Sequence, residues 1–199
     1  SVLPADLDRL AAFAEELAGA ARRVSLKYFR TDINPEIKAD SSPVTIADRE
    51  IETLLRDHID AAFPNHGILG EEFGAIRTEA EYVWVLDPID GTKSFITGKP
   101  LFGTLIGLLH RGYAVMGICD MPALRERWIG KQGQKTIFNG FPTQARNCSK
   151  LEDAWLYATS PQMFTKDNFQ RFEILRKASS SAIYGAECQA YGLLACGWG

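Results

Sequence analysis

The segment Trp84-Val85-Leu86-Asp87-Pro88-Ile89-Asp90-Gly91-Thr92 is the one around which the rest of the chain is organised. Its first three residues are a short apolar run typical of a buried strand, and Gly91 with Thr92 marks a tight turn or a helix start. Asp87 and Asp90 therefore lie where a strand ends. Mg²⁺ prefers oxygen ligands from one or two carboxylates, and N–H groups at a helix start attract anions. The segment is suited to hold a metal ion beside a phosphate group.

An ordinary turn would explain the same residues, because Asp-Pro and Asp-Gly are common turn dipeptides and Asp is a frequent helix cap. A second acidic pair, Glu71-Glu72, follows another short apolar stretch, Ile68-Leu69. Two strand ends that both finish in carboxylates can converge on one site, and buried carboxylates that gather there need a compensating cation. The two acidic segments together favour a metal site over a turn.

Composition excludes several classes of protein. The 199 residues are 46% hydrophobic with a net charge of -3, which predicts a globular core in one domain or two small lobes. No basic run supports nucleic-acid binding, and no apolar stretch approaches the length of a membrane span. No signal peptide is visible at the N-terminus, so we expect a cytoplasmic protein, or a plastid one if a transit peptide has been removed. The four cysteines match no zinc pattern and are typical of buried thiols in a reducing compartment.

Helical periodicity predicts a first helix over residues 6–30 with Asp6 as its N-cap, and a second over residues 45–63. Thr45 and Asp48 form an approximate capping box at the start of the second helix. Between the two helices, residues 31–44 are polar and indicate a loop or a weak hairpin.

The middle of the chain predicts an antiparallel meander. Residues 73–82 read as an exposed excursion and residues 94–100 as a loop. Four segments of strand character follow the central stretch, at residues 102–110, 113–120, 125–130 and 135–138.

Beyond these strands the pattern alternates between strand and helix. The expected elements are a strand at 154–159, a helix at 167–177, a strand at 182–184 and a helix at 187–196. We therefore predict an N-terminal α+β lobe over residues 1–145 and an α/β lobe over residues 146–199.

The quoted residues resemble the inositol monophosphatase-like family of Mg²⁺-dependent, lithium-sensitive phosphatases. The resemblance runs from about Leu7 to the C-terminus, and its most specific parts are Gly70-Glu71-Glu72 and the segment from Trp84 to Thr92. Lys38 and the segment Ser42-Pro43-Val44-Thr45-Ile46-Ala47-Asp48 also match. The resemblance implies an α+β fold, a layered α/β/α/β/α sandwich with an antiparallel sheet in the N-terminal lobe.

Three further segments are most similar to the histidinol-phosphatase branch of this family. They are Thr92–Pro100, Arg125–Gly130 and Tyr184–Cys188. The branch implies hydrolysis of L-histidinol phosphate to L-histidinol and phosphate in histidine biosynthesis. Inositol-1-phosphate, nucleotide 3′-phosphate and fructose-1,6-bisphosphate activities of the same fold stay open, and so does an inert metal-binding scaffold. The sequence contains no glycine-rich phosphate-binding loop, which argues against a nucleotide-binding module.

The resemblance implies two or three Mg²⁺ ions per active site, with two of them about 4 Å apart to clamp the reacting oxygens. Glu71, Asp87 and the Ile89 carbonyl would hold one ion, and Asp87 would bridge to a second ion that Asp90 also binds. Asp48 has two compatible readings, a helix-stabilising first-turn carboxylate worth about half a kcal/mol and a ligand at the edge of the metal cluster.

The remaining site residues would bind substrate or water. The amides of Gly91 and Thr92 would bind the phosphate, while Glu71 and the Thr92 hydroxyl would orient an attacking water. By resemblance Lys38 would approach that water, whereas composition alone supports a solvated lysine. Gly185, Ala186 and Glu187 would meet the alcohol part of a small phosphorylated substrate, with Glu187 facing an ammonium group or, alternatively, capping a helix.

One departure from the family pattern concerns the C-terminus. The family carries a third acidic motif there, a Trp-Asp followed by small residues, whose Asp completes the second metal site, and the chain ends at Cys196-Gly197-Trp198-Gly199 without it. Together with the start at Ser1, this predicts a polypeptide that is truncated in its C-terminal lobe. A homodimer is expected from the family.

Overall fold

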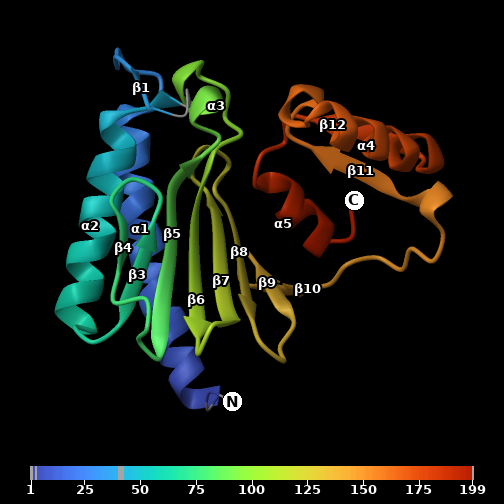
Figure 1. Cartoon of the computed structure of the whole chain (residues 1–199). Coiled ribbons are helices and arrows are strands. Elements are labelled where there is room, and N and C mark those ends of the chain that lie inside the picture. Colours follow the sequence, from blue (N-terminus) through green and yellow to red (C-terminus); the bar gives the residue numbers. More distant parts are fainter. Residues whose placement is uncertain (1, 3, 40–42, 199) are drawn as a thin grey trace.

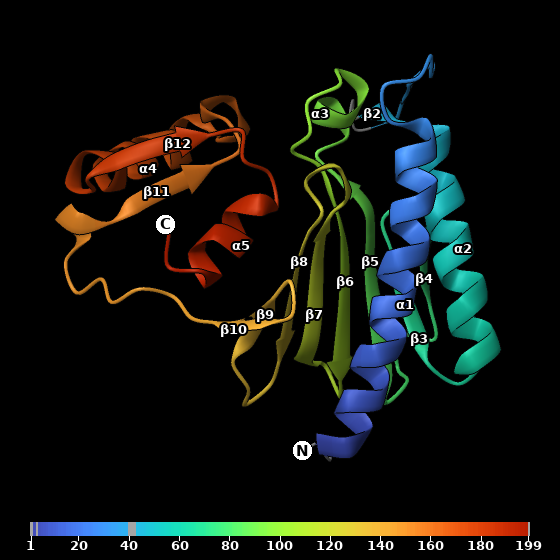
Figure 2. The same ribbon diagram turned by 180° about the vertical axis from the view of Figure 1, so that it is seen from behind.

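The computed structural model describes residues 2, 4–39 and 43–198, so Ser42 of the Ser42–Asp48 segment lies outside the described residues. The elements form five layers (Figure 1). Helices α1 (Pro4–Tyr28) and α2 (Ile46–Ala62) form the first layer, and an eight-stranded sheet the second. Helix α5 (Gln189–Ala195) lies between this sheet and a pair of strands, β11 (Trp155–Ala158) and β12 (Ser181–Tyr184), with α4 (Lys166–Ala178) outermost (Figure 2). The layered α/β/α/β/α fold is confirmed.

The large sheet is mixed rather than wholly antiparallel. Its order is β10-β9-β8-β7-β6-β5-β3-β4, and its only parallel pair among the described strands is β3 with β5. Its strands are β3 (Gly67–Gly70), β4 (Gly74–Ile76), β5 (Tyr82–Asp90), β6 (Gly103–His110), β7 (Tyr113–Met121), β8 (Glu126–Lys131), β9 (Thr136–Phe138) and β10 (Phe141–Thr143). The antiparallel sheet that we predicted is wrong at this edge, because β4 turns back along β3 before the chain enters β5.

The two long helices cover one face of the sheet and form the main core with it. Leu17, Ile51, Leu55 and Trp84 are fully buried there. Each such side chain stabilises the fold by about 1.5–3 kcal/mol. The capping box at Thr45 is confirmed, but α1 begins at Pro4, so Asp6 lies in the first helical turn instead of acting as the N-cap. The expected weak hairpin is β1 (Glu36–Ile37) paired with β2 (Pro43–Val44).

The central segment differs from the expectation in one respect. Strand β5 continues through Asp87 to Asp90, and its pairing with β6 shifts between these two residues, which marks a bulge. Gly91, with a φ of 83°, ends the strand and precedes α3 (Thr92–Ile96). The predicted loop at 94–100 therefore begins only at Thr97, and the excursion at 73–82 contains β4.

The C-terminal elements form a β-α-β unit followed by a short helix. Strands β11 and β12 pair in parallel, with α4 as their connection. Helix α5 starts two residues later than expected, with Cys188 at its N-cap, and Glu187 lies just before it with a φ of 50°. Glu187 therefore neither opens nor caps this helix. The division into lobes at residue 145 stays a prediction. None of the described helices has the length and apolar character needed to cross a bilayer.

Candidate active site

Asp87 has the most unusual environment of the described residues. Its Oδ1 atom is the only buried side-chain oxygen or nitrogen among them that has no hydrogen-bond partner. Burial, followed by the neighbouring carboxylate of Glu71, raises the pKa of Asp87 to about 8, and the charges of Asp90 and Asp48 act in the same direction. Three neighbouring carboxylates thus oppose the ionisation of Asp87, and a cation would relieve this repulsion.

The parallel pairing of β3 with β5 brings the two acidic segments together. Gly70 pairs with Leu86, and the N–H of Glu71 donates to the Leu86 carbonyl at 3.2 Å. Lys38 approaches from the β1–β2 side, where its Nζ atom lies 3.2 Å from Glu71 Oε1 and 2.6 Å from Glu72 Oε1. Burial raises the pKa of Glu72, while Lys38 opposes that effect. The lysine is therefore an ion-pair partner and not merely solvated.

Asp48 connects the start of α2 with the turn after β5. Its Oδ2 atom accepts hydrogen bonds from the Thr45 N–H at 2.8 Å and the Thr45 hydroxyl at 2.6 Å. Its Oδ1 atom lies 3.3 Å from the Thr92 hydroxyl, which is also 3.0 Å from the Ile89 carbonyl. Burial raises the pKa of Asp48, against the hydrogen bonds from Thr45. The capping role and the place beside the carboxylates are both present in the structure.

Gly91 lies where the acidic segment meets the C-terminal part of the chain. Its positive φ favours glycine, and a Cβ atom there would be 2.9 Å from Glu187 Cγ. The N–H of Cys188 donates to Asp90 Oδ2 at 2.7 Å, and the Ser94 hydroxyl lies 3.5 Å from Glu187 Oε1. Burial and the charge of Asp90 raise the pKa of Glu187. Glu187 therefore lies beside the carboxylate cluster.

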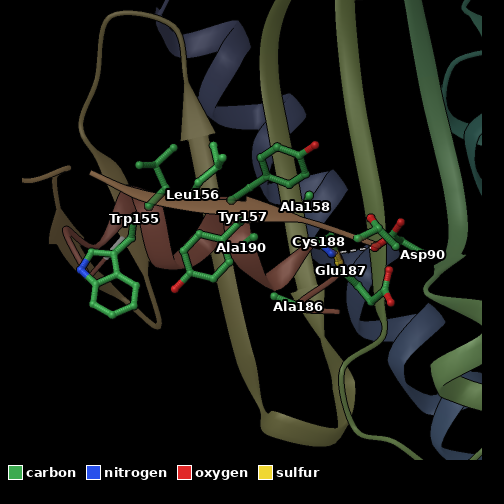
Figure 3. Close-up of a pocket in the computed structure, with 12 residues that line it drawn as sticks. Asp90, Trp155, Leu156, Tyr157, Ala158, Ala186, Glu187, Cys188 and Ala190 are labelled. Atoms are coloured by element: carbon green, nitrogen blue, oxygen red, sulfur yellow. Dashed lines mark hydrogen bonds between the residues drawn. The ribbon is translucent and has the colours of Figure 1, made fainter. Parts of the chain in front are cut away.

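A cavity of about 330 Å³ extends from this junction between β11 and α5 (Figure 3). Asp90 and Glu187 are its acidic residues, and Ala186 also lines it. Most of the remaining lining is aromatic or aliphatic, with Trp155, Leu156, Tyr157, Ala158, Ala190, Tyr191 and Leu194. Gly185 does not line the cavity, and its carbonyl accepts a hydrogen bond from Lys99 Nζ at 2.6 Å.

The donor set suits a hard cation such as Mg²⁺. It consists of carboxylates and a backbone carbonyl, which are the ligands that this ion prefers, and Asp87 Oδ1 has no partner of its own. Within residues 2, 4–39 and 43–198, no three His, Cys, Asp or Glu side chains already stand in a metal-ligating group. Asp90 and Glu71 are instead engaged with the Cys188 N–H and Lys38. Mg²⁺ would therefore compete with these two contacts.

One buried carboxylate beside the site was missed by the sequence analysis. Glu52 has no exposed surface and accepts hydrogen bonds from the N–H groups of Glu72 and Phe73. It lies one helical turn after Asp48, in the apolar stripe that contains Ile51 and Leu55. A carboxylate inside an apolar helical stripe was the signal that could have identified it.

The comparisons with known proteins agree on one family. The model of the inositol monophosphatase family matches residues 6–198. The chain is 48% identical over 195 residues to a protein of Arabidopsis thaliana named bifunctional phosphatase IMPL2, chloroplastic, covering 97% of this chain and 56% of that protein. It is 42% identical over 132 residues to a histidinol-phosphatase of Chlorobaculum parvum, which is 66% of this chain and 51% of that protein.

A solved structure gives the same result for the fold. An inositol monophosphatase from Zymomonas mobilis matches with a TM-score of 0.86 and 39% identity, covering 96% of this chain and 74% of that one. The chain thus spans about half the length of the curated relatives that it matches. With the family model matching residues 6–198, this chain belongs to the inositol monophosphatase family.

Proposed function

We propose that the protein is a Mg²⁺-dependent phosphate-monoester hydrolase that acts on L-histidinol phosphate. The observation that carries this proposal is the buried, unpartnered Oδ1 atom of Asp87, whose ionisation three other carboxylates oppose. One of the three, Asp90, lines a cavity of ligand size. Family membership and the phosphatase names of the relatives support the reaction class.

The metal ligands proposed are Glu71, Asp87, the Ile89 carbonyl and Asp90. When bound, Mg²⁺ supplies concentrated positive charge that polarises the phosphate and stabilises the charge of the transition state. Asp48 would bind an ion at the edge of this group, directly or through water. Its Oδ1 atom is the one that Thr45 does not use, and this atom faces the Thr92 hydroxyl.

The chain's own groups would orient the reactants. The carboxylate of Glu71 would accept a proton from the attacking water, and the Thr92 hydroxyl, held between Asp48 and the Ile89 carbonyl, would fix the position of that water. The amides of Gly91 and Thr92 would bind phosphate oxygens. We expect water to attack the phosphorus directly, without a phosphoenzyme, because the residues proposed for the reaction include no Ser, Cys or His.

The lining of the cavity supports an amino alcohol with a flat ring. Glu187 offers a carboxylate to an ammonium group, and Trp155, Tyr157 and Tyr191 offer aromatic faces. Inositol is a polyol and would leave most of its hydroxyls against apolar side chains, which is unfavourable. Relatives named histidinol-phosphatase, at 39–42% identity, agree with this preference.

Phosphate release by the full-length protein tests the proposal. Histidinol phosphate and inositol 1-phosphate would be offered in parallel with Mg²⁺, with and without EDTA. We expect a strong preference for histidinol phosphate that EDTA abolishes. A preference for inositol 1-phosphate would retain the metal site and refute the substrate. Failure to release phosphate from either ester would point to another ester or to an inert scaffold.

Three further properties stay predictions drawn from the family. The protein is expected to form a homodimer, to be inhibited by lithium and to act without a nucleic-acid or membrane partner. A cytoplasmic location was expected, with a plastid as the alternative, and the relative from Arabidopsis thaliana is named as chloroplastic. Sedimentation and fractionation of the native protein would test assembly and location.

A further inference from the structure

Glu52, in the second turn of α2, contacts the acidic turn that follows β3. Building on the proposed function, we propose that Glu52 is a positioning residue for Glu71, and that Arg56 and Gly70 complete this support. Three sets of contacts carry the proposal: the hydrogen bonds of Glu52, the space beside Gly70, and the attachment of Glu71 to β5.

The carboxylate of Glu52 uses both of its oxygens on the turn. Its Oε2 atom accepts from the Glu72 N–H at 2.6 Å, and its Oε1 atom accepts from the Phe73 N–H at 3.1 Å. Arg56 donates from Nε to Oε1 at 2.8 Å and from Nη2 to the Gly74 carbonyl. The pair therefore binds the backbone of the turn at three places, and Arg56 compensates the buried charge of Glu52.

Gly70 provides the space for this contact. A Cβ atom built on Gly70 would lie 1.9 Å from Glu52 Oε1 and 2.7 Å from Arg56 Nη2. Any side chain there would push the carboxylate off the turn, although the backbone conformation of Gly70 is not one that requires glycine. Glycine is thus needed at this position for the close approach of Glu52.

Three successive N–H groups of the turn are consequently held in place. The N–H of Glu71 donates to the Leu86 carbonyl of β5, and the next two donate to Glu52. The side chain of Glu71 itself is 47% exposed and forms an ion pair with Lys38. Because its own packing restrains it little, its position relative to Asp87 depends on the backbone that Glu52 holds. Groups that orient a metal ligand commonly affect metal affinity by about 10–100-fold.

Replacing Glu52 by glutamine tests the proposal with little change in shape. The glutamine amide has one acceptor oxygen instead of two. Its NH₂ group must therefore face a backbone N–H group from which the carboxylate accepted a hydrogen bond. We expect E52Q to raise the dissociation constant for Mn²⁺, measured by electron paramagnetic resonance, by about tenfold or more. The half-saturating Mg²⁺ concentration for phosphate release should rise similarly, with kcat partly restored at high Mg²⁺.

The matched control is Asp120→Asn, which alters an equally buried carboxylate away from the turn. Asp120 in β7 has no exposed surface and is bound by Arg22 and Arg127. D120N should lower the melting temperature at least as much as E52Q, yet bind Mn²⁺ like the wild type. A purely structural role of Glu52 would make the two variants alike in Mn²⁺ affinity, and that result would overturn the proposal.

A second pair of variants tests the same support without changing any charge. G70A should weaken Mn²⁺ binding as E52Q does, whereas G130A, in β8 with open space beside it, should bind normally. This pair decides the matter if E52Q does not fold. Wild-type Mn²⁺ affinity in G70A would refute the positioning role while the proposed function stands. Wild-type protein that binds no Mn²⁺ and releases no phosphate would refute the proposed function and the inference with it.

Discussion

The eight-stranded sheet carries a fully buried carboxylate, Asp120, and a half-buried one with a buried oxygen, Asp87, in very different surroundings. In β7, Asp120 receives hydrogen bonds from Arg22 Nε at 3.0 Å and Arg127 Nε at 2.7 Å. In β5, the Oδ1 atom of Asp87 has no partner, and the charges that act most on the pKa of Asp87 are those of other carboxylates. The chain therefore neutralises the first charge by itself and leaves the second uncompensated, as the proposed cation site requires. A buried charge that its own fold does not compensate is a guide to function, because selection for stability alone would not retain it.

The largest expected effect is that of Asp87→Asn on phosphate release. We expect a loss on the order of a thousandfold, because the variant removes a metal ligand and the electrostatic stabilisation that depends on it. The measurement is kcat/KM for histidinol phosphate at saturating Mg²⁺. D120N serves as the control and should stay within a few fold of wild type. Near-normal turnover by D87N would place the metal elsewhere.

The second effect is on stability and concerns the neutralised carboxylate. D120N should lower the free energy of unfolding by about 2–3 kcal/mol, since it leaves Arg22 and Arg127 without a full counter-charge in a buried setting. This expected loss of stability is smaller than that for a fully buried ion pair, because both arginine side chains are partly exposed to solvent. Urea unfolding measures it. A loss under half a kcal/mol would show that this ion pair contributes little and would weaken the contrast.

The third effect is a pH dependence to which Asp87 should contribute the largest part. The pKa of Asp87 is about 8 in the folded chain and 3.8 for an unperturbed aspartate, so between these values the folded chain holds the extra proton. The contribution of Asp87 to the stability of the metal-free protein must then fall as pH rises from about 4 to about 8, by about 1.4 kcal/mol per pH unit at most. Urea unfolding in EDTA at several pH values measures this slope. An equal slope in D87N would contradict the assignment to Asp87.

The smallest effect concerns Glu187, a third carboxylate whose counter-charge would come from the substrate. E187Q should lower kcat/KM for histidinol phosphate about five- to tenfold, the value of a partly exposed ion pair. Release from inositol 1-phosphate should change little, because inositol carries no ammonium group. The ratio of the two rates is the measurement, and an equal loss for both esters would assign Glu187 a structural role.

Local sequence signals predicted much of the site's framework. The capping box at Thr45, the apolar run before Asp87 and the glycine at position 91 are short-range features, and each was identified from the sequence. The sequence also predicted that two strand ends finishing in carboxylates would converge, but it did not predict the parallel pairing of β3 with β5 that makes them neighbours.

Long-range features were not predictable in the same way. The bulge between Asp87 and Asp90 depends on pairing with β6, and the close approach of Glu187 to Gly91 joins segments far apart in the sequence. Glu52 was missed because a charged residue on a helix is usually at the surface, and only the fold shows which backbone groups it accepts from. These features depend on contacts between segments far apart in the sequence, so local sequence patterns could not predict them.

Thermal unfolding of the wild type and D87N at a pH above 8, each with and without Mg²⁺, tests the central claim most directly. In EDTA, D87N should be the more stable protein, because it lacks the uncompensated buried charge. Mg²⁺ should raise the melting temperature of the wild type and leave that of D87N nearly unchanged, since a ligand stabilises the state that binds it. Equal Mg²⁺ shifts in both proteins, or a wild type that Mg²⁺ does not stabilise, would contradict the account.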